Sequence, residues 1–150
     1  MAAYFAYQGS LAGGTKPGNA SAEAQSVDHS RGSGKSVLVV DDEGVVRMFL
    51  KETLSRWGYS VDVAAHGVEA VRRLSQQAYA VILTDIEMPH MNGVSLWRHA
   101  VEAGHPGSWI LMTGSTVPQL ERAVPILGKP LRLVELRDTL ERAALGETTR

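Results

Sequence analysis

Five short apolar runs constrain the fold of this chain more than any other feature. They cover residues 37–40, 60–64, 80–84, 109–112 and 124–127. In most of these runs the apolar residues follow one another without alternation, which is typical of strands buried on both faces of a parallel sheet. We therefore expect five strands, most of them buried on both sides.

Between these runs the apolar residues recur at spacings of three and four, which predicts helices. The expected helices cover residues 46–57, 67–76, 94–103 and 132–145. Strands that alternate with helices of this length favour right-handed crossovers and a parallel sheet. The predicted fold class is α/β, with a doubly wound, five-stranded parallel sheet and helices on both faces.

The first part of the chain has a different composition. Ala, Gly and Ser supply 18 of residues 1–34, and the few large apolar residues there show neither strand nor helix spacing. Such a segment buries too little apolar surface to offset its ordering entropy. We expect a flexible tail or linker over residues 1–34, one domain over residues 35–146, and a C-terminal tail over residues 147–150.

Charge and composition exclude several classes of function. The chain has 15 basic and 16 acidic residues, so a net charge of −1 does not favour direct binding to nucleic acid or to an anionic membrane. The absence of cysteine excludes thiolate metal sites and cysteine nucleophiles. The apolar runs are far shorter than the roughly 20 residues of a membrane span, and the N-terminus lacks the features of a secretory signal. We expect a cytoplasmic protein without a membrane partner.

Polar residues directly follow three of the five apolar runs, and a lysine follows a fourth run after one glycine. Asp41 and Asp42 follow the first run, Asp85 follows the third, Thr113 follows the fourth, and Lys129 comes shortly after the fifth. The carboxyl ends of parallel strands meet at one edge of a sheet, where ligands bind at the switch point of the strand order. The topology alone therefore predicts that these five residues converge.

The residue types at this edge favour phosphoryl chemistry. Clustered carboxylates repel one another, and a Mg²⁺ ion with its preference for oxygen ligands removes that conflict. The ammonium of Lys129 and the hydroxyl of Thr113 suit phosphoryl oxygens. An aspartate can itself be the nucleophile and form an aspartyl phosphate, in a reaction that depends mainly on positioning and charge neutralisation.

Four motifs, in order, resemble those of response-regulator receiver domains. They are Val-Leu-Val-Val-Asp-Asp-Glu at 37–43, Asp-Ile-Glu-Met-Pro-His-Met-Asn-Gly at 85–93, Met-Thr-Gly at 112–114 and Gly-Lys-Pro at 128–130. The resemblance covers about residues 36–145. It implies the flavodoxin-like strand order 2-1-3-4-5, two-component signal transduction, and a partner histidine kinase or phosphotransfer protein.

The same resemblance implies roles for the acidic residues. Asp85 is the expected phosphoacceptor. Asp42 and Asp85 are expected to bind Mg²⁺ through their carboxylates, with Asp41 contributing directly or through water. The backbone carbonyl of Glu87 would be the remaining protein ligand.

For Thr113 and Lys129 the resemblance implies contacts with the phosphoryl group. Thr113 is expected to move and donate a hydrogen bond to it, and Lys129 is expected to pair with it. Receivers typically have a cis peptide bond before the proline that follows this lysine, here Pro130.

Two features depart from the usual receiver pattern. The family usually has Tyr or Phe three residues before the lysine, where this chain has Ile126. Lys129 follows Thr113 by only 16 positions, so the fourth helix must be short and fit roughly residues 117–122, with Pro118 in its first turn. Such a shortened segment resembles receivers attached to histidine kinases more than those of DNA-binding regulators.

The leading hypothesis is a receiver that is not itself an enzyme. Because the chain stops soon after its last predicted helix, we expect it to signal through a downstream protein partner or as part of a larger polypeptide.

Two alternatives remain open. A phosphorylation-independent adaptor is motivated by Ile126 and the short fourth helix. A Mg²⁺-dependent phosphatase is motivated by Glu87, which stands where such enzymes place a general acid–base, two residues after an Asp nucleophile.

Overall fold

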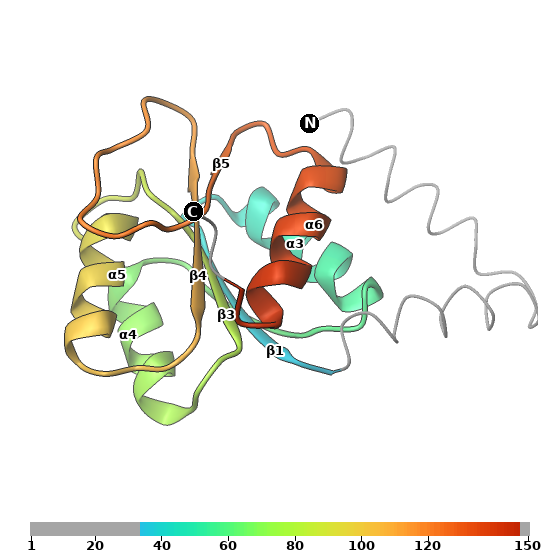
Figure 1. The fold of residues 1–150 in the computed structure, drawn as a ribbon, viewed down its shortest axis with the longest axis horizontal. Helices are drawn as coiled ribbons and strands as arrows, with labels where there is room; N and C mark the ends of the chain where they lie inside the picture. Colours follow the sequence, from blue (N-terminus) through green and yellow to red (C-terminus); the bar gives the residue numbers. More distant parts are fainter. Residues whose placement is uncertain (1–33, 148–150) are drawn as a thin grey trace, which may run out of the picture.

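The computed structural model describes residues 34–147, which form a five-stranded parallel sheet between two layers of helices (Figure 1). The strands are β1 (Ser36–Val40), β2 (Ser60–Ala64), β3 (Val81–Asp85), β4 (Ser108–Thr113) and β5 (Ile126–Gly128). The helices are α3 (Gly44–Arg56), α4 (Gly67–Gln76), α5 (Gly93–Glu102) and α6 (Leu133–Ala144). The strands pair in the order β2-β1-β3-β4-β5, which confirms the predicted fold class and strand order.

The bounds of most elements agree with the spacing of apolar residues in the sequence. β2 and α4 begin and end where expected, and the other expected elements differ by one or two residues at their ends. The expected tails lie outside the described residues, except for residues 34 and 147. No helix in the described part of the chain is both long enough and apolar enough to cross a bilayer.

The two faces of the sheet divide the core into two clusters. In β1, Val37 and Val39 pack with α3 and α6, whereas Leu38 and Val40 pack with α4 and α5. All four side chains are fully buried. Helices on both faces leave no side of a central strand in water, which is why the sequences of the central strands do not alternate.

The expected helix over residues 117–122 is not present, and the prediction of a shortened fourth helix is wrong. The segment between β4 and β5 runs without a helix along the end of α5 (Figure 1). Pro118 lacks an N–H, and Pro125 disfavours helical geometry at Val124. The few residues left between the two prolines offer too little length to nucleate a helix. Leu120 and Val124 pack against the α4 and α5 side of the core without one.

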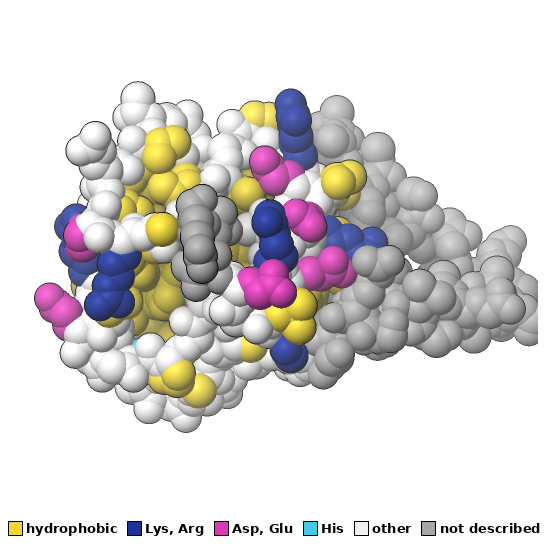
Figure 2. Space-filling model, viewed as in Figure 1, with side chains coloured by type: hydrophobic (Ala, Val, Ile, Leu, Met, Phe, Trp, Pro, Cys, Tyr) yellow, Lys and Arg dark blue, Asp and Glu magenta, His cyan; other side chains and the backbone are white. Residues whose placement is uncertain are grey.

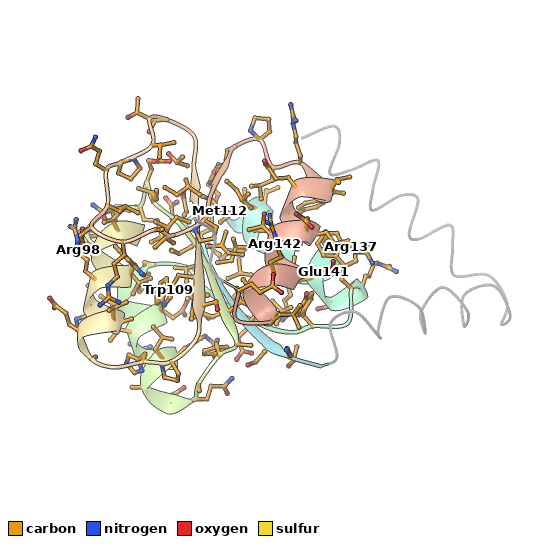
Figure 3. The ribbon with its side chains drawn as sticks, in the orientation of Figure 1. Arg98, Trp109, Met112, Arg137, Glu141 and Arg142 are labelled. Carbon is orange, nitrogen blue, oxygen red and sulfur yellow. The ribbon has the colours of Figure 1, made fainter. Side chains whose placement is uncertain are left out.

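The missing helix leaves a groove beside β4. Its volume is about 250 Å³, and Trp97, Val101, Trp109 and Val124 contribute to its walls. Figure 2 shows apolar side chains gathered in a hollow on this side of the molecule, and Figure 3 shows Trp109 on the α5 side of β4. The tryptophans themselves are buried core residues. The groove opens near the amino ends of β4 and β5, away from the edge where the acidic residues meet.

Candidate functional site

The carboxyl ends of β1, β3, β4 and β5 bring the predicted site residues to one edge of the sheet. Asp41 follows β1 directly, Asp85 is the last residue of β3, Thr113 is the last residue of β4, and Lys129 follows β5. β1 and β3 are neighbours, yet the chain continues from them toward opposite edges of the sheet. The acidic residues therefore meet at the switch point of the strand order, as the sequence predicted.

Asp41 is a fully buried anchor of this edge. Its Oδ1 accepts a hydrogen bond from the backbone N–H of Glu43 at 2.9 Å, and its Oδ2 accepts one from Lys129 Nζ at 3.0 Å. Its backbone carbonyl accepts a hydrogen bond from Arg47 Nη1 at 2.7 Å. These contacts hold the start of the β1–α3 connection against a residue 88 positions away.

Asp85 is 3% exposed and is less well satisfied than Asp41. Its Oδ1 lies 3.3 Å from Lys129 Nζ, but within the described residues this buried oxygen has no hydrogen-bond donor of good geometry. Burial and then the charge of Asp41 raise the pKa of Asp85 to about 6, although Lys129 opposes the shift. The negative form of Asp85 is therefore destabilised in the folded chain.

Lys129, which follows β5, forms ion pairs with several acids of the site. Besides its contacts with Asp41 and Asp85, its Nζ lies 3.8 Å from Glu43 Oε1. Burial by itself would lower the pKa of Lys129, but the hydrogen bond to Asp41 and the charges of Asp41 and Asp85 raise it above its ordinary value. Its backbone N–H donates to the Thr113 carbonyl at 2.7 Å, and the expected cis peptide joins it to Pro130.

The side chain of Glu87 lies on the opposite side of the site, against the end of β4. Its Oε2 accepts a hydrogen bond from the Thr113 hydroxyl at 2.6 Å, and its Oε1 accepts one from the Gly114 backbone N–H at 2.9 Å. Burial acts to raise the pKa of Glu87, but these hydrogen bonds and one from Ser115 outweigh it and hold that pKa below its usual range. From the sequence, Glu87 was expected to offer its backbone carbonyl to Mg²⁺, or its side chain as a general acid–base. No sequence pattern predicted that this side chain would bind the end of β4.

Gly93 is a second residue of the site that sequence reasoning did not single out for its size. A Cβ at this position would collide with the backbone carbonyl of Asp85. The Gly93 N–H donates to the Ile86 carbonyl at 2.9 Å, and Asn92 Oδ1 caps the start of α5 by accepting from the Ser95 N–H at 2.8 Å. The absence of a side chain at Gly93 therefore lets α5 start directly beside the carboxyl end of β3.

The donor set fits a hard divalent cation. Asp41, Asp42 and Asp85 each offer a carboxylate oxygen, and these oxygens lie within 4.8 Å of one another. Two of the three side chains are buried, and one oxygen of Asp85 has no hydrogen-bond partner among the described residues. Carboxylate oxygens in this number suit Mg²⁺, which keeps part of its water shell. The ion pair of Lys129 neutralises only part of the negative charge.

The sequence matches the response regulator receiver domain family over residues 37–141. The chain belongs to this family. As a receiver, it is 32% identical over 118 residues to the response regulator receiver protein CpdR of Brucella abortus, covering 75% of this chain and 98% of that protein. It is also 34% identical over 111 residues to the sensor protein EvgS of Escherichia coli, covering 70% of this chain but only 9% of that much longer protein.

Solved structures agree with this placement of the receiver. The chemotaxis protein CheY4 of Vibrio cholerae superposes with a TM-score of 0.66 and 29% identity, covering 73% of this chain and 98% of that one. The shared fold and the shared family thus extend over the part of the chain that carries the acidic edge. The segment between β4 and β5, which has no helix here, belongs to the matched region.

Proposed function

We propose that this receiver accepts a phosphoryl group on Asp85 and passes the signal to a downstream protein. The observation that carries the proposal is the state of the Asp85 carboxylate. It is nearly inaccessible, it has one oxygen without a hydrogen bond within the described residues, and it lies close to two other aspartates and a lysine. A nucleophile kept short of hydrogen bonds and beside a cation is suited to attack phosphorus.

The proposed transfer forms one bond and breaks one bond. A carboxylate oxygen of Asp85 donates an electron pair to the phosphorus of a phosphohistidine, and a new O–P bond forms. The N–P bond breaks, and the histidine nitrogen keeps that electron pair and takes a proton from water. The receiver then carries an aspartyl phosphate, and the donor is left as neutral histidine.

Mg²⁺ is the proposed cofactor. Asp41, Asp42 and Asp85 would hold it, together with the backbone carbonyl of Glu87. When bound, it would neutralise the carboxylates and the phosphoryl oxygens, whose negative charges otherwise oppose the reaction. Titration with Mg²⁺ while carboxyl carbon shifts are followed by NMR should perturb Asp42 and Asp85. Tens of millimolar Mg²⁺ is far above the dissociation constant expected for such a site. Chemical shifts that stay unchanged at this concentration would overturn the metal assignment.

Lys129 and Thr113 are the proposed phosphoryl contacts. Lys129 already lies 3.3 Å from the nucleophile, so its ammonium can bind an oxygen of the incoming group without a large movement. Thr113 carries its hydroxyl at the end of the neighbouring strand, next to the Gly114 N–H. Together they offer a positive charge from β5 and two neutral donors from β4.

A histidine kinase or a phosphotransfer protein is the proposed phosphoryl donor. Several relatives are receivers within kinases, including the sensor histidine kinase RcsC of Salmonella typhi, which is 32% identical over 110 residues and of which this chain spans 12%. A partner protein rather than nucleic acid is the proposed recipient of the signal, because the net charge is −1. We expect Asp85→Asn to abolish transfer from such a kinase without unfolding the receiver.

The decisive test uses a small phosphodonor. Acetyl phosphate with Mg²⁺ should add a single phosphoryl group, which intact-mass analysis detects, and Asp85→Asn should remove the label. The site itself supplies nucleophile, metal ligands and lysine, so a protein donor is not required for chemistry. Labelling that persists in Asp85→Asn would overturn the assignment, and partner binding that ignores Asp85→Asn would favour a phosphorylation-independent adaptor.

We propose stoichiometric acceptance rather than enzymatic turnover. A phosphatase would use Glu87 as a general acid–base, but the carboxylate of Glu87 is bound by Thr113 and Gly114. The receiver should therefore not release phosphate repeatedly from a small phosphate ester such as p-nitrophenyl phosphate. Steady multiple turnover that is lost in both Asp85→Asn and Glu87→Gln would establish the phosphatase instead.

A further inference from the structure

The side chain of Glu87 makes contacts that the proposed phosphoryl transfer does not use. Its carboxylate accepts hydrogen bonds from the Thr113 hydroxyl, the Gly114 N–H and the Ser115 hydroxyl at 2.6, 2.9 and 3.3 Å. These donors lie 26 to 28 positions further along the chain. An anion from the loop after β3 thus binds at the end of β4, beside the proposed phosphoacceptor.

Thr113 and Gly114 each have one proton to offer. A hydroxyl has a single O–H and a backbone amide has a single N–H. A phosphoryl group on Asp85 would bring three acceptor oxygens and nearly two negative charges at neutral pH. Because the same donors cannot fully satisfy two anions, a phosphoryl group gains them only when Glu87 gives them up.

Charge repulsion acts in the same direction as the competition for donors. The negative charge of Glu87 is felt at Asp85, where it adds to the larger effects of burial and of Asp41. Phosphorylation increases the negative charge at Asp85, so the repulsion of Glu87 grows. Glu87 is exposed in the described structure, and its side chain can move into water without opening the core.

We propose that Glu87 is an internal competitor of the phosphoryl group, bound to Thr113 and Gly114 before phosphorylation and displaced by it. The proposal rests on the proposed function, since it concerns the same site. The displaced and bound states of Glu87 differ in the contact between the loop after β3 and the end of β4. This exchange gives the receiver two states without the aromatic residue that Ile126 replaces.

The test measures how tightly each receiver variant binds beryllofluoride, a phosphoryl mimic, with Mg²⁺ present. Glu87→Ala removes the competitor and should bind the mimic about tenfold more tightly than the wild type, as expected for the loss of a charged hydrogen-bonded competitor. Glu87→Gln keeps an acceptor oxygen without the charge, so its affinity for the mimic should lie between those of the wild type and Glu87→Ala. Glu102→Ala, which removes an exposed glutamate at the far end of α5, is the matched charge control and should behave as wild type.

A second readout separates displacement from a purely structural role. In the wild type, the Glu87 carboxyl carbon and the Gly114 amide should both shift in NMR spectra when beryllofluoride binds. In Glu87→Ala, the Gly114 amide should already be shifted before the mimic is added. A Glu87 carboxyl signal that stays unchanged on binding would overturn displacement.

The outcomes also distinguish this proposal from the proposed function. Equal affinities of wild type and Glu87→Ala, with Asp85 still phosphorylated by acetyl phosphate, would overturn competition and leave the function standing. Failure of both proteins to bind beryllofluoride and to accept a phosphoryl group would overturn both. Tighter binding by Glu87→Ala, with a shifted Glu87 signal in the wild type, would support both.

Discussion

The two sides of the Asp85 site are held by opposite kinds of contact. On the β5 side, the ammonium of Lys129 binds the carboxylates of Asp41 and Asp85 and draws like charges together. On the β4 side, the neutral donors of Thr113 and Gly114 are bound by the carboxylate of Glu87. One side offers a cation to an incoming anion, whereas the other side already holds an anion.

This difference predicts that the two sides would respond differently to the proposed phosphorylation. Lys129 can bind a phosphoryl oxygen while it keeps its contacts with the acids, because an ammonium has three protons to donate. Thr113 and Gly114 have one proton each and must change partner. We therefore expect the Lys129 side to stabilise the proposed reaction from the start and the Thr113 side to contribute only after Glu87 is displaced.

The largest expected effect comes from removing the cation. Lys129→Met should slow labelling of Asp85 by acetyl phosphate about a hundredfold, as typically found when a group that stabilises developing charge is removed. Initial rates from intact-mass analysis measure the effect, and Lys51→Met removes an equal but exposed charge of α3 as control. Equal rates in the two variants would show that the Lys129 side does not drive the reaction.

The next effect is the dependence of stability on pH without metal. The pKa of Asp85 lies at about 6 in the folded chain, above its ordinary value of 3.8. Between these values the folded state holds a proton that the unfolded chain has lost, so the free energy of unfolding falls as pH rises. This group should contribute a loss of about 2 kcal/mol across that window, somewhat less than the full shift of about two pKa units would give.

Urea unfolding at a series of pH values in a chelator measures this loss. Asp85→Asn lacks the titrating group, so its stability should not show the decline between pH 4 and 6. Mg²⁺ should flatten the wild-type profile if the three aspartates hold the ion. A wild-type profile that matches that of Asp85→Asn would show that Lys129 already neutralises Asp85 fully.

A smaller effect is expected from the hydroxyl of Thr113. Thr113→Val removes a donor from the phosphoryl group and also from Glu87, so the two losses partly cancel. In the Glu87→Ala background only the phosphoryl mimic loses the hydroxyl donor, and Thr113→Val should weaken beryllofluoride binding about tenfold. The four affinities form a double-mutant cycle, and Thr113→Ser keeps the hydroxyl as control. An equal loss of beryllofluoride affinity in both backgrounds would show that Thr113 and Glu87 act independently.

The smallest expected effect concerns the helices far from the exchange. Beryllofluoride with Mg²⁺ should change amide hydrogen exchange mainly over residues 86–93 and 113–122 and should leave α6 nearly unchanged. Ile126 is smaller than an aromatic residue and has a stiff χ1, so it carries little movement toward β5. Large exchange changes across α6 would show that the Lys129 side also transmits a conformational change.

Much of the fold follows from local patterns in the sequence. The unbroken apolar run Val37–Val40 predicts a buried strand. In the helix that follows, apolar residues such as Phe49 and Leu50 recur at spacings of three and four and predict its buried face, and all of these residues are buried in the structure. The order of strands and helices then limits the topology to few choices, since parallel crossovers are right-handed. The same order predicted that Asp41, Asp85 and Lys129 meet.

The segment between β4 and β5 was not predictable in the same way. A resemblance to other receivers suggested a short helix there, but Pro118 and Pro125 leave too few residues for one. Whether a short segment forms a helix depends on what it packs against, and Leu120 and Val124 pack against the core without a helix. Local propensity is a weak guide when tertiary contacts supply most of the stability.

By itself, the sequence determined the parallel sheet and the convergence of acids and lysine at one edge, because these follow from burial periodicity and chain connectivity. The strand order was implied by the resemblance to receivers, and the structure confirms it. Only the tertiary structure decided what the carboxylate of Glu87 binds. That contact joins two loops whose separation depends on the register of β3 against β4, where Asp85 pairs with Met112 and places Thr113 beside the loop. No local pattern encodes such a distance, and it is this distance that turns two free donors into an occupied anion site.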